Sequence, residues 1–391
     1  MFEGHARRSI GALCDFFNGN GFRPPDWRPS GLPIIRIQNL NGSQNFNYFD
    51  GEPKPKWIVE PGDLLFAWAG VKGVSFGPTI WPGPRGVLNQ HIFRIVPKKG
   101  VDKYWLYLAL QVATRRIESN AHGFKSSLVH VQKDDITNQV VDLPPLPEQR
   151  KIAEILRTWE EAIEKLQALR AANLKRRIWM RTHLFTGRTR LPGYSGDWRE
   201  VTLGEVLTEH GLRGTGAEEV FSVSVHKGLV NQIEHLGRSF AAAETSHYNR
   251  VLPGDIVYTK SPTGDFPLGI IKQSKISEQV IVSPLYGVFS PATRALGAIL
   301  DALFESPLAV RNYLHPLVQK GAKNTIAITN RRFLEGKLRL PMDHAEQSAL
   351  VEMVEVSQAE FTAIEAKIEA LSRQKRGLMQ KLLTGEWRVS P

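Results

Sequence analysis

The sequence predicts an α+β fold in which two similar domains are separated by two long antiparallel, coiled-coil-like spacer helices, with an internal pseudo-twofold repeat. Three observations lead to this prediction. Apolar residues recur every seven positions within 147–187 and again within 346–385, a pattern typical of one helix packed on another. The two copies keep one constant offset, since 346 − 148 and 384 − 186 both give 198. Each copy follows a region of short strand-like runs and loops rich in Gly and Pro.

The first domain, residues 1–142, is expected to contain short strands, turns and one helix. Residues 34–37 and 91–96 have the composition of strands, and Pro61-Gly62-Asp63 is a turn that leads into a third strand. The segments 19–31 and 77–86 are so rich in Gly and Pro that loops are expected there. The spacing of apolar residues within 104–117 predicts a helix.

The first spacer helix is assigned to residues 143–187, and about 37 helical residues would span roughly 55 Å. Its partner is expected in the same chain, at residues 342–385, because that stretch carries the same heptad pattern. To bury its apolar seam against the first helix, the second helix must run back antiparallel. The predicted seam residues are Ile152, Leu156, Trp159, Ile163, Leu166, Met180 and Leu184 in the first helix, and Leu350, Val354, Phe361, Ile364, Ile368, Leu371, Leu378 and Leu382 in the second.

Residues 188–341 repeat the first domain, and residues 386–391 form a C-terminal tail. Pro253-Gly254-Asp255 corresponds to Pro61-Gly62-Asp63, and residues 284–289 correspond to the strand at 91–96. The offset between matching positions changes from 192, as in 255 − 63, to 198 through the domains, but it stays constant through the helices. The loops of the two domains therefore differ, whereas the length of the helices is kept.

Composition restricts the partners and the compartment. The 391 residues include 50 Lys and Arg against 39 Asp and Glu, a formal charge of +11, and the isoelectric point is about 9.7. Such a basic surplus suits a polyanionic partner. The single cysteine, Cys14, excludes an internal disulfide and a cysteine-based zinc cluster. No apolar run approaches the roughly 18 residues that span a bilayer, and MFEGHARRSI lacks the apolar core of a signal peptide, so we expect a cytoplasmic protein with no membrane partner.

Two segments imitate catalytic motifs. Residues 17–21, FNGNG, fit the F-x-G-x-G pattern of S-adenosylmethionine-dependent methyltransferases, but Pro24-Pro25 prevents the helix that should follow. Asp26 with Glu52-Pro53-Lys54 imitates the carboxylates and lysine of a nuclease, but the proline would interrupt the strand that should carry them. The chain has neither a P-loop nor a His pair with metal-ligand spacing. We therefore expect no catalytic site, no metal and no cofactor bound by this chain.

Family motifs stand at both ends of the first helix. Leu143-Pro144-Pro145-Leu146-Pro147-Glu148-Gln149, followed by residues 152–156 and closing on Leu184-Phe185-Thr186-Gly187, resembles the conserved region that follows each target recognition domain in the specificity subunit of type I restriction-modification enzymes. Residues 17–19, 31–40 and 61–65 look like the start of such a domain. The second copy departs from the pattern at residues 340–345, LPMDHA, but Glu346-Gln347 and the heptads remain. The resemblance covers almost the whole chain.

The resemblance implies a subunit without a catalytic centre. Each recognition domain would read one half of a split double-stranded DNA target, and the helices would set the gap between the halves. A spacer of roughly 55 Å covers about one and a half turns of B-DNA. Two copies of a DNA adenine methyltransferase subunit, together with restriction/translocase subunits, would supply the chemistry, and S-adenosylmethionine, ATP and Mg would bind to those partners.

Contacts to DNA need Lys and Arg for phosphates, and Arg, Lys, Asn or Gln for base edges. Lys125 and Lys323 occupy equivalent places in the two domains, shortly after a Gly that lets the backbone approach a phosphate. Which residue reads which base does not follow from the sequence. The candidates are Arg23, Arg28, Arg36, Asn39, Lys72, Asn89, Gln90 and Lys125 in the first domain, and Lys260, Lys323, Arg331 and Arg332 in the second.

Two alternatives stay open at this point. The chain could be the recognition subunit of a related restriction enzyme in which one polypeptide carries both methylase and nuclease, and copurification would distinguish this case. It could also be a scaffold that joins two protein-binding modules without touching DNA. That version predicts no salt-dependent DNA affinity, whereas a reader with several phosphate contacts loses affinity steeply as salt rises.

Overall fold

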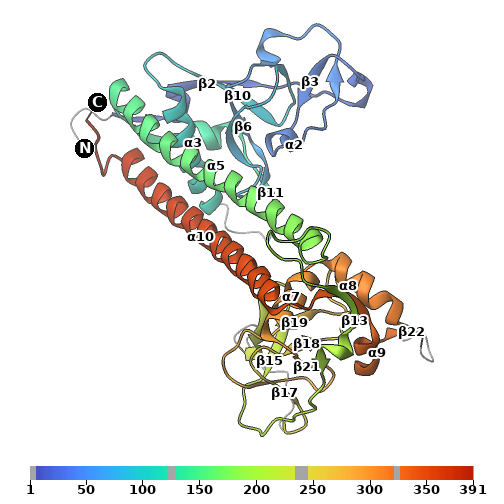
Figure 1. The fold of residues 1–391 in the computed structure, drawn as a ribbon. Helices are drawn as coiled ribbons and strands as arrows, with labels where there is room; N and C mark the ends of the chain where they lie inside the picture. Colours follow the sequence, from blue (N-terminus) through green and yellow to red (C-terminus); the bar gives the residue numbers. More distant parts are fainter. Residues whose placement is uncertain (1–5, 121–127, 234–244, 321–325, 391) are drawn as a thin grey trace. The chain divides into compact units, whose positions relative to one another are not determined.

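The computed structural model describes residues 6–120, 128–233, 245–320 and 326–390 (Figure 1). The chain forms two compact units. Unit 1 comprises Met1–Gln167 and Lys367–Pro391, and unit 2 comprises Ala168–Ala366. Each unit mixes short strands with helices, which confirms the predicted α+β class. The boundary between the units falls within the two long helices, so each unit contains a part of each helix.

Two four-stranded sheets form most of unit 1. The first has the order β2 (Cys14–Asn18), β10 (Ile92–Pro97), β6 (Leu64–Ala67) and β8 (Gly77–Ile80), with antiparallel pairs throughout. The second has the order β4 (Tyr48–Phe49), β3 (Leu32–Ile35), β9 (Gly86–Leu88) and β5 (Ile58–Val59), and its β3–β9 pair is parallel. Two further antiparallel pairs join β1 (Ala6–Ser9) to β12 (Val140–Leu143), and β7 (Ala69–Val71) to β11 (Leu128–His130).

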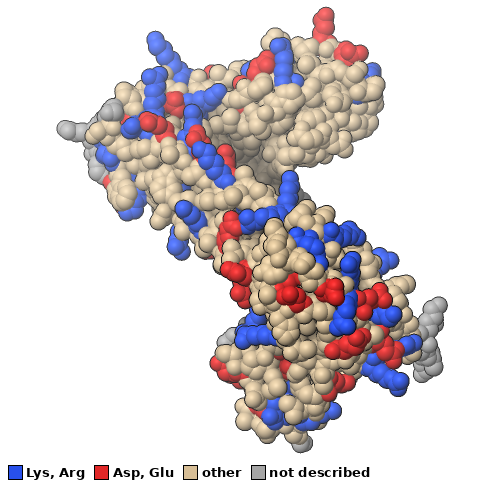
Figure 2. Space-filling model, in the orientation of Figure 1, with Lys and Arg blue, Asp and Glu red and all other residues tan. Residues whose placement is uncertain are grey.

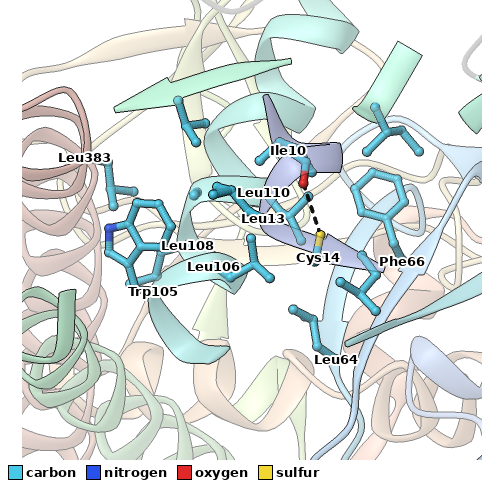
Figure 3. Close-up of a cluster of buried hydrophobic side chains, with 14 of the residues drawn as sticks. Ile10, Leu13, Cys14, Leu64, Phe66, Trp105, Leu106, Leu108, Leu110 and Leu383 are labelled. Carbon is cyan, nitrogen blue, oxygen red and sulfur yellow. Dashed lines mark hydrogen bonds between the residues drawn. The ribbon is translucent and has the colours of Figure 1, made fainter. Parts of the chain in front are cut away.

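The main core of unit 1 lies between the first sheet and the helices α1 (Ile10–Leu13) and α3 (Lys103–Asn120). Figure 3 shows Ile10, Phe66 and Trp105 in this cluster, together with Leu383 from the last turn of α10. Trp105 is fully buried. Because burial of apolar surface is the main stabilising term in folding, the end of α10 is held in unit 1 by this core. The short helices α2 (Ile37–Leu40) and α4 (Lys133–Thr137) complete the unit.

The strands at 64–67 and 92–97 and the helix at 103–120 confirm three predictions, but two others were wrong. The predicted strand at 34–37 ends at Ile35, because the Asn39 side chain accepts the main-chain N–H of Arg36 at 2.9 Å and starts the turn into α2. The predicted loop at 77–86 begins with strand β8. A proline is tolerated in β8 because it is the edge strand of its sheet, where one face of the backbone needs no partner.

Unit 2 repeats the strand order of the first sheet of unit 1, with β14 (Leu207–Thr208), β21 (Gly287–Pro291), β18 (Ile256–Tyr258) and β19 (Ile271–Gln273). Four antiparallel pairs accompany it: β13 (Trp198–Thr202) with β24 (Lys337–Pro341), β15 (Phe221–Ser224) with β16 (Gly228–Asn231), β17 (Asn249–Val251) with β20 (Val280–Val282), and β22 (Gln319–Lys320) with β23 (Ile326–Ala327). The helices are α7 (Arg294–Phe304), α8 (Pro307–Leu314) and α9 (Asn330–Glu335).

The two long helices are α5 (Leu146–His183) and α10 (His344–Leu383). In unit 1, Glu160 of α5 pairs with Lys375 at 2.9 Å, and Glu148 at the start of α5 pairs with Arg388 beyond the end of α10. In unit 2, Arg170 and Arg176 of α5 pair with Glu365 and Glu360 of α10. In each unit the helix segments therefore run antiparallel. The predicted seam residues are all buried or half-buried.

The ends of these helices follow from local sequence. Gly187 and Gly385 follow the helices with φ of +66° and +71°, a left-handed conformation that favours glycine and terminates a helix. At the start of α10, where the sequence departs from the first copy, the Asp343 carboxylate accepts the N–H groups of Ala345 and Glu346 at 2.8 and 3.0 Å. Asp343 thus caps the helix without the proline run. Among the described residues, no helix is both long enough and apolar enough to cross a membrane.

The seam also contains two polar residues. Asn173 of α5 and Ser357 of α10 are each 3% exposed, and both belong to unit 2. Neither amide atom of Asn173, nor the hydroxyl of Ser357, has a hydrogen-bond partner among the described residues. A buried polar group without a partner costs about 1–3 kcal/mol, so this part of the seam is less stable than an apolar one would be.

Candidate nucleic-acid interface

A pocket of about 200 Å³ lies in unit 1, at the carboxyl ends of strands β3 and β9. Its lining includes Arg36, Gln38, Asn89 and His91. Because β3 and β9 are parallel and Ile35 is opposite Leu88, the next residues on the two strands, Arg36 and Asn89, lie side by side. Small-molecule sites usually have volumes of roughly 300 Å³ or more. The pocket therefore suits contact with the edge of a ligand better than enclosure of a cofactor.

Polar atoms around this pocket are buried without hydrogen-bond partners among the described residues. They are Arg36 Nε, Asn89 Oδ1, His91 Nδ1, Trp27 Nε1 and Trp68 Nε1. The Arg36 guanidinium lies over the Trp27 ring at 5.2 Å, and the Trp68 ring lies 4.9 Å from that of His91, so the five residues form one neighbourhood. Most buried polar groups in folded proteins are hydrogen-bonded. This concentration of unpaired donors and acceptors suits a polar ligand that supplies the missing partners.

The hydrogen bond between Gln90 and His91 defines the His91 tautomer. The Gln90 amide nitrogen lies 3.0 Å from His91 Nε2. An amide nitrogen can only donate, so Nε2 accepts and the ring proton of the neutral imidazole is on Nδ1. His91 therefore presents an N–H donor that is buried and unpaired, while the exposed Gln90 side chain is partly engaged.

The FNGNG loop has a structural role at this site. Asn20 donates its main-chain N–H to Leu88 O at 2.8 Å, and a Cβ added to Gly19 would lie 2.0 Å from the carbonyl oxygen of Asn89. Only glycine allows this approach. The motif that imitates a cofactor loop therefore packs directly on the main chain of Asn89 and holds it in place.

The remaining candidates of unit 1 have different surroundings. Asn39 is buried and uses its side chain inside the loop, donating to the main-chain oxygens of Ser43 and Asn45. Arg28 donates to the main-chain oxygens of Pro25 and Trp27, and Lys72 donates to that of Glu118 at 3.1 Å. Arg23 is exposed. Asn39 thus shapes the turn that presents Arg36, and the three cations stand outside the pocket.

In unit 2 the described candidates have different acidic neighbours. Among the described non-glycine residues, Lys260 alone has a positive φ, +57°, and burial lowers the pKa of its amine, opposed by the nearby charge of Glu209. Arg331 and Arg332 of α9 pair with Glu335, but ion pairs at a protein surface contribute little, so both stay available to a partner. Lys125 and Lys323 lie outside the described residues.

Charge does not single out a DNA-binding face on the side of the molecule shown in Figure 2. On the side shown in Figure 2, Lys and Arg side chains are scattered among Asp and Glu. Within the described parts of the chain, no group of three or more His, Cys, Asp and Glu side chains could hold a metal ion. The polar pocket at β3 and β9 is therefore the most specific feature of this interface.

Comparison with known proteins identifies the family of the first part of the chain. Residues 3–173 match the type I restriction modification DNA specificity domain. That segment is such a specificity domain. The chain is 28% identical over 165 residues to the specificity subunit of the Escherichia coli type I restriction enzyme EcoBI, a match that covers 41% of this chain and about a third, 34%, of that subunit. It is 24% identical over 358 residues to the MjaVIII specificity subunit of Methanocaldococcus jannaschii, covering 85% of this chain and 80% of the relative.

A solved structure shows the same fold over the whole chain. The S subunit of a type I restriction-modification system from M. genitalium superposes with a TM-score of 0.59 at 16% identity, covering 97% of this chain and 96% of that one. The family match and the two relatives confirm the prediction of a type I restriction-modification specificity subunit, and they do not support the two alternatives. The matched specificity domain contains the pocket and most of α5.

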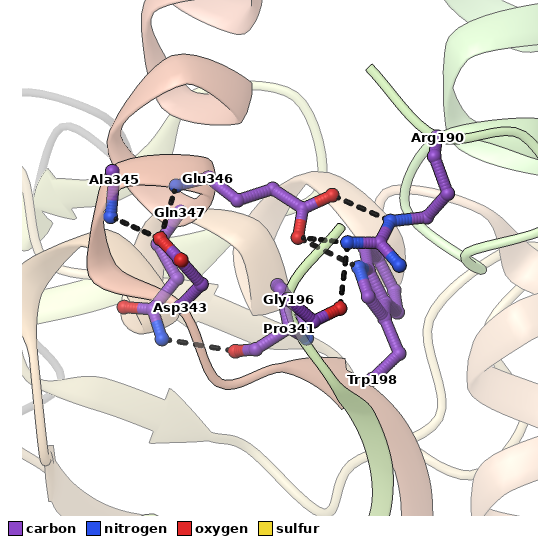
Figure 4. A network of polar contacts seen from close by, with 8 residues as sticks. All are labelled: Arg190, Gly196, Trp198, Pro341, Asp343, Ala345, Glu346 and Gln347. Atoms are coloured by element: carbon purple, nitrogen blue, oxygen red, sulfur yellow. Dashed lines mark hydrogen bonds and ion pairs between the residues drawn. The ribbon is translucent and has the colours of Figure 1, made fainter. Parts of the chain in front are cut away.

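Sequence reasoning missed Arg190 and Arg388, two arginines that fasten the long helices to the domains. The Glu346 carboxylate at the start of α10 is 1% exposed and accepts hydrogen bonds from Arg190 Nε and Nη2, both at 2.7 Å, and from Trp198 Nε1 at 3.1 Å (Figure 4). In the specificity domain, Glu148 at the start of α5 accepts two bonds of 2.7 Å from Arg388. These bonds raise the pKa of both guanidinium groups. Both arginines stand three residues after the helix-terminating glycine, a repeated spacing that could have revealed them.

The glutamine after each glutamate makes a second anchor. Gln149 accepts the N–H of Asp102 at 2.8 Å and donates to the main-chain oxygen of Pro144. Gln347 accepts the hydroxyl of Thr293 at 2.8 Å and donates to the main-chain oxygen of Pro341 at 2.9 Å. Each Glu-Gln dipeptide is buried and joins the first turn of a long helix to the unit that contains it.

Proposed function

We propose that this chain recognises a bipartite double-stranded DNA target, one half per unit, and directs methyltransferase and restriction subunits to it. One observation carries the proposal: the two units repeat the same strand pairing around different side chains. β9 pairs with β3 in parallel and with β5 antiparallel, and β20 likewise bridges Val220 in parallel and pairs with β17 antiparallel. Val87 of unit 1 and Ile281 of unit 2 occupy matched positions. Two residues later the chain has Asn89 in unit 1 and Ser283 in unit 2. A shared backbone with different side chains suits two surfaces that read different bases.

In this proposal α5 and α10 form a coiled-coil-like spacer with pseudo-twofold symmetry that sets the gap between the half-sites. Their lengths of 38 and 40 residues, their antiparallel pairing in each unit and the two buried Glu-Gln anchors support this role. A helix of this length spans roughly 55–60 Å. A gap of fixed length between two specified halves is the expected consequence.

We propose that the chain itself is not catalytic and that two copies of an adenine methyltransferase subunit, with restriction/translocase subunits, supply the chemistry. Those partners would bind S-adenosylmethionine, ATP and Mg. Exposed apolar side chains on the long helices in unit 2 support a protein partner there. Leu174 and Ile178 lie one turn apart on α5, and Val356 lies on α10. Contiguous exposed apolar patches mark interaction surfaces.

The deciding experiment is to express the chain with its methyltransferase subunit in a host without modification and to map N6-methyladenine across the genome. The expected result is a split motif, two short specified halves around a fixed unspecified gap. Replacing residues 1–142 with another recognition domain should change one half only. A stable complex that methylates nothing, or an exchange that abolishes the specificity of both halves, would contradict the proposal.

Binding to duplex DNA provides an independent check. The logarithm of the association constant should fall linearly with the logarithm of the salt concentration, with a slope of about −0.9 for each phosphate contacted. Affinity that does not change with salt would favour a protein-binding scaffold instead.

A further inference from the structure

The pocket at the ends of β3 and β9 has the chemistry to recognise one kind of base. We infer that Asn89 and Arg36 together read an adenine on its major-groove edge within the half-site of unit 1. This inference rests on the proposed function and assigns specificity to particular side chains. It starts from the position of the two residues, which follow the parallel pair Ile35 and Leu88 directly and line the same pocket.

The main chain of both residues and the guanidinium of Arg36 are held in place before any ligand binds. The main chain of Asn89 is bonded to Ile35 O at 3.0 Å and packed against Gly19. The turn after β3 is held by the buried Asn39 side chain, which accepts the N–H of Arg36, and the Trp27 ring supports the guanidinium. Preorganised side chains lose little entropy on binding, so the pocket suits recognition more than a mobile loop would.

The unpaired atoms of the pocket match adenine. Arg36 Nε is a donor without a partner and Asn89 Oδ1 is an acceptor without a partner among the described residues. In the major groove adenine presents the N7 acceptor beside the N6 amino donor, whereas guanine presents the two acceptors N7 and O6. Guanine would leave Asn89 Oδ1 buried and unpaired. The expected preference for adenine is about 5- to 150-fold in affinity.

The inference applies to unit 1 alone. By the strand pairing, Arg36 corresponds to Ser222 and Asn89 to Ser283, because Val220 and Ile281 stand where Ile34 and Val87 stand. The strand pairing shifts the sequence-based match of 91–96 with 284–289 by one position, so His91 corresponds to the exposed Leu285. The donors and acceptors that suit adenine are thus replaced in unit 2, and the second half-site should not depend on this chemistry.

The test uses the complex with the methyltransferase subunit and compares methylation motifs. Asn89→Ala and Arg36→Ala should relax one adenine position in one half of the motif by about 5-fold or more and leave the other half unchanged. Asn89→Ser, which introduces the residue found at the equivalent place in unit 2, should do the same with less risk to folding. The matched control is Arg85→Ala, an exposed arginine of unit 1 that pairs with Glu60 at 3.2 Å, and it should keep the full motif.

Base analogues then test the individual atoms. In a duplex that contains the wild-type motif, replacing that adenine with 7-deazaadenine removes the N7 acceptor and should weaken binding to the wild type but not further weaken binding to Arg36→Ala. The inference is overturned if the variants keep the motif, or if the relaxed position is a G·C pair. A wild-type complex that yields no split motif would instead overturn the proposed function, so the two failures are distinguishable.

Discussion

Replacing Arg190 with alanine tests how α10 is fastened to unit 2. In the native chain the Glu346 carboxylate is 1% exposed and accepts three hydrogen bonds, two of them from Arg190. Arg190→Ala leaves this buried charge with Trp198 as its remaining side-chain donor. Removing one partner of a buried ion pair costs about 3–5 kcal/mol. Because the Arg190 side chain is 30% exposed, water replaces part of its charge, and we expect a loss of about 2–3 kcal/mol.

Urea and thermal unfolding measure this loss. For a unit of 150–250 residues, 1 kcal/mol lowers the melting temperature by roughly 2–4 °C, so the transition of unit 2 should fall by roughly 4–12 °C. Arg188→Ala, which removes an exposed arginine two residues earlier, is the matched control and should change little. The double variant with Glu346→Gln should recover part of the loss, because no buried charge is then left unpaired. An Arg190→Ala protein within about 0.5 kcal/mol of the wild type would refute the reasoning.

Three further predictions concern the helices and the core. Leu166→Pro should break α5 at a cost of about 3 kcal/mol or more, visible as lost helical circular dichroism and lost assembly, and an unchanged complex would contradict the spacer role. Asn173→Leu should raise the unfolding free energy by about 1–2 kcal/mol, because the buried amide has no partner among the described residues; a loss of stability in urea titration would disprove this. Burial raises the pKa of Cys14 from 9.0 to about 12, so the native thiol should resist iodoacetamide at pH 8.5 until urea is added. Because the unfolded thiol loses its proton at a lower pH than the buried one, the free energy of unfolding should fall as the pH rises from 9 to 12. Rapid labelling of the native protein would contradict it.

Local sequence was sufficient for the long helices. The heptad spacing that defines the seam depends on residues three and four positions apart, and a helix brings such residues onto one face whatever the rest of the chain does. The glycines that follow α5 and α10 act in the same local way. In the folded chain the residues predicted for the seam are all buried or half-buried.

Local sequence patterns misled where one particular contact decided the outcome. Arg36 looks like the continuation of a strand, yet a hydrogen bond from Arg36 to Asn39 turns the chain into α2. Residues 77–80 look like a loop because of Gly77 and Pro78, yet the neighbouring strand β6 recruits them as an edge strand. FNGNG imitates a cofactor loop, but its first glycine, Gly19, serves close packing against the main chain of Asn89.

The candidate site itself was decided by tertiary structure. Arg36 and Asn89 are two of twelve candidate DNA-contact residues that the sequence does not rank, and the parallel pairing of β3 with β9 places them side by side, 53 positions apart in the chain. Arg190 and Glu346, which are separated by 156 positions, were invisible as a pair. Charged and polar side chains carry no periodic signal of their partner. Apolar periodicity reports which face of a helix is buried, but only the folded chain determines which donors meet which acceptors.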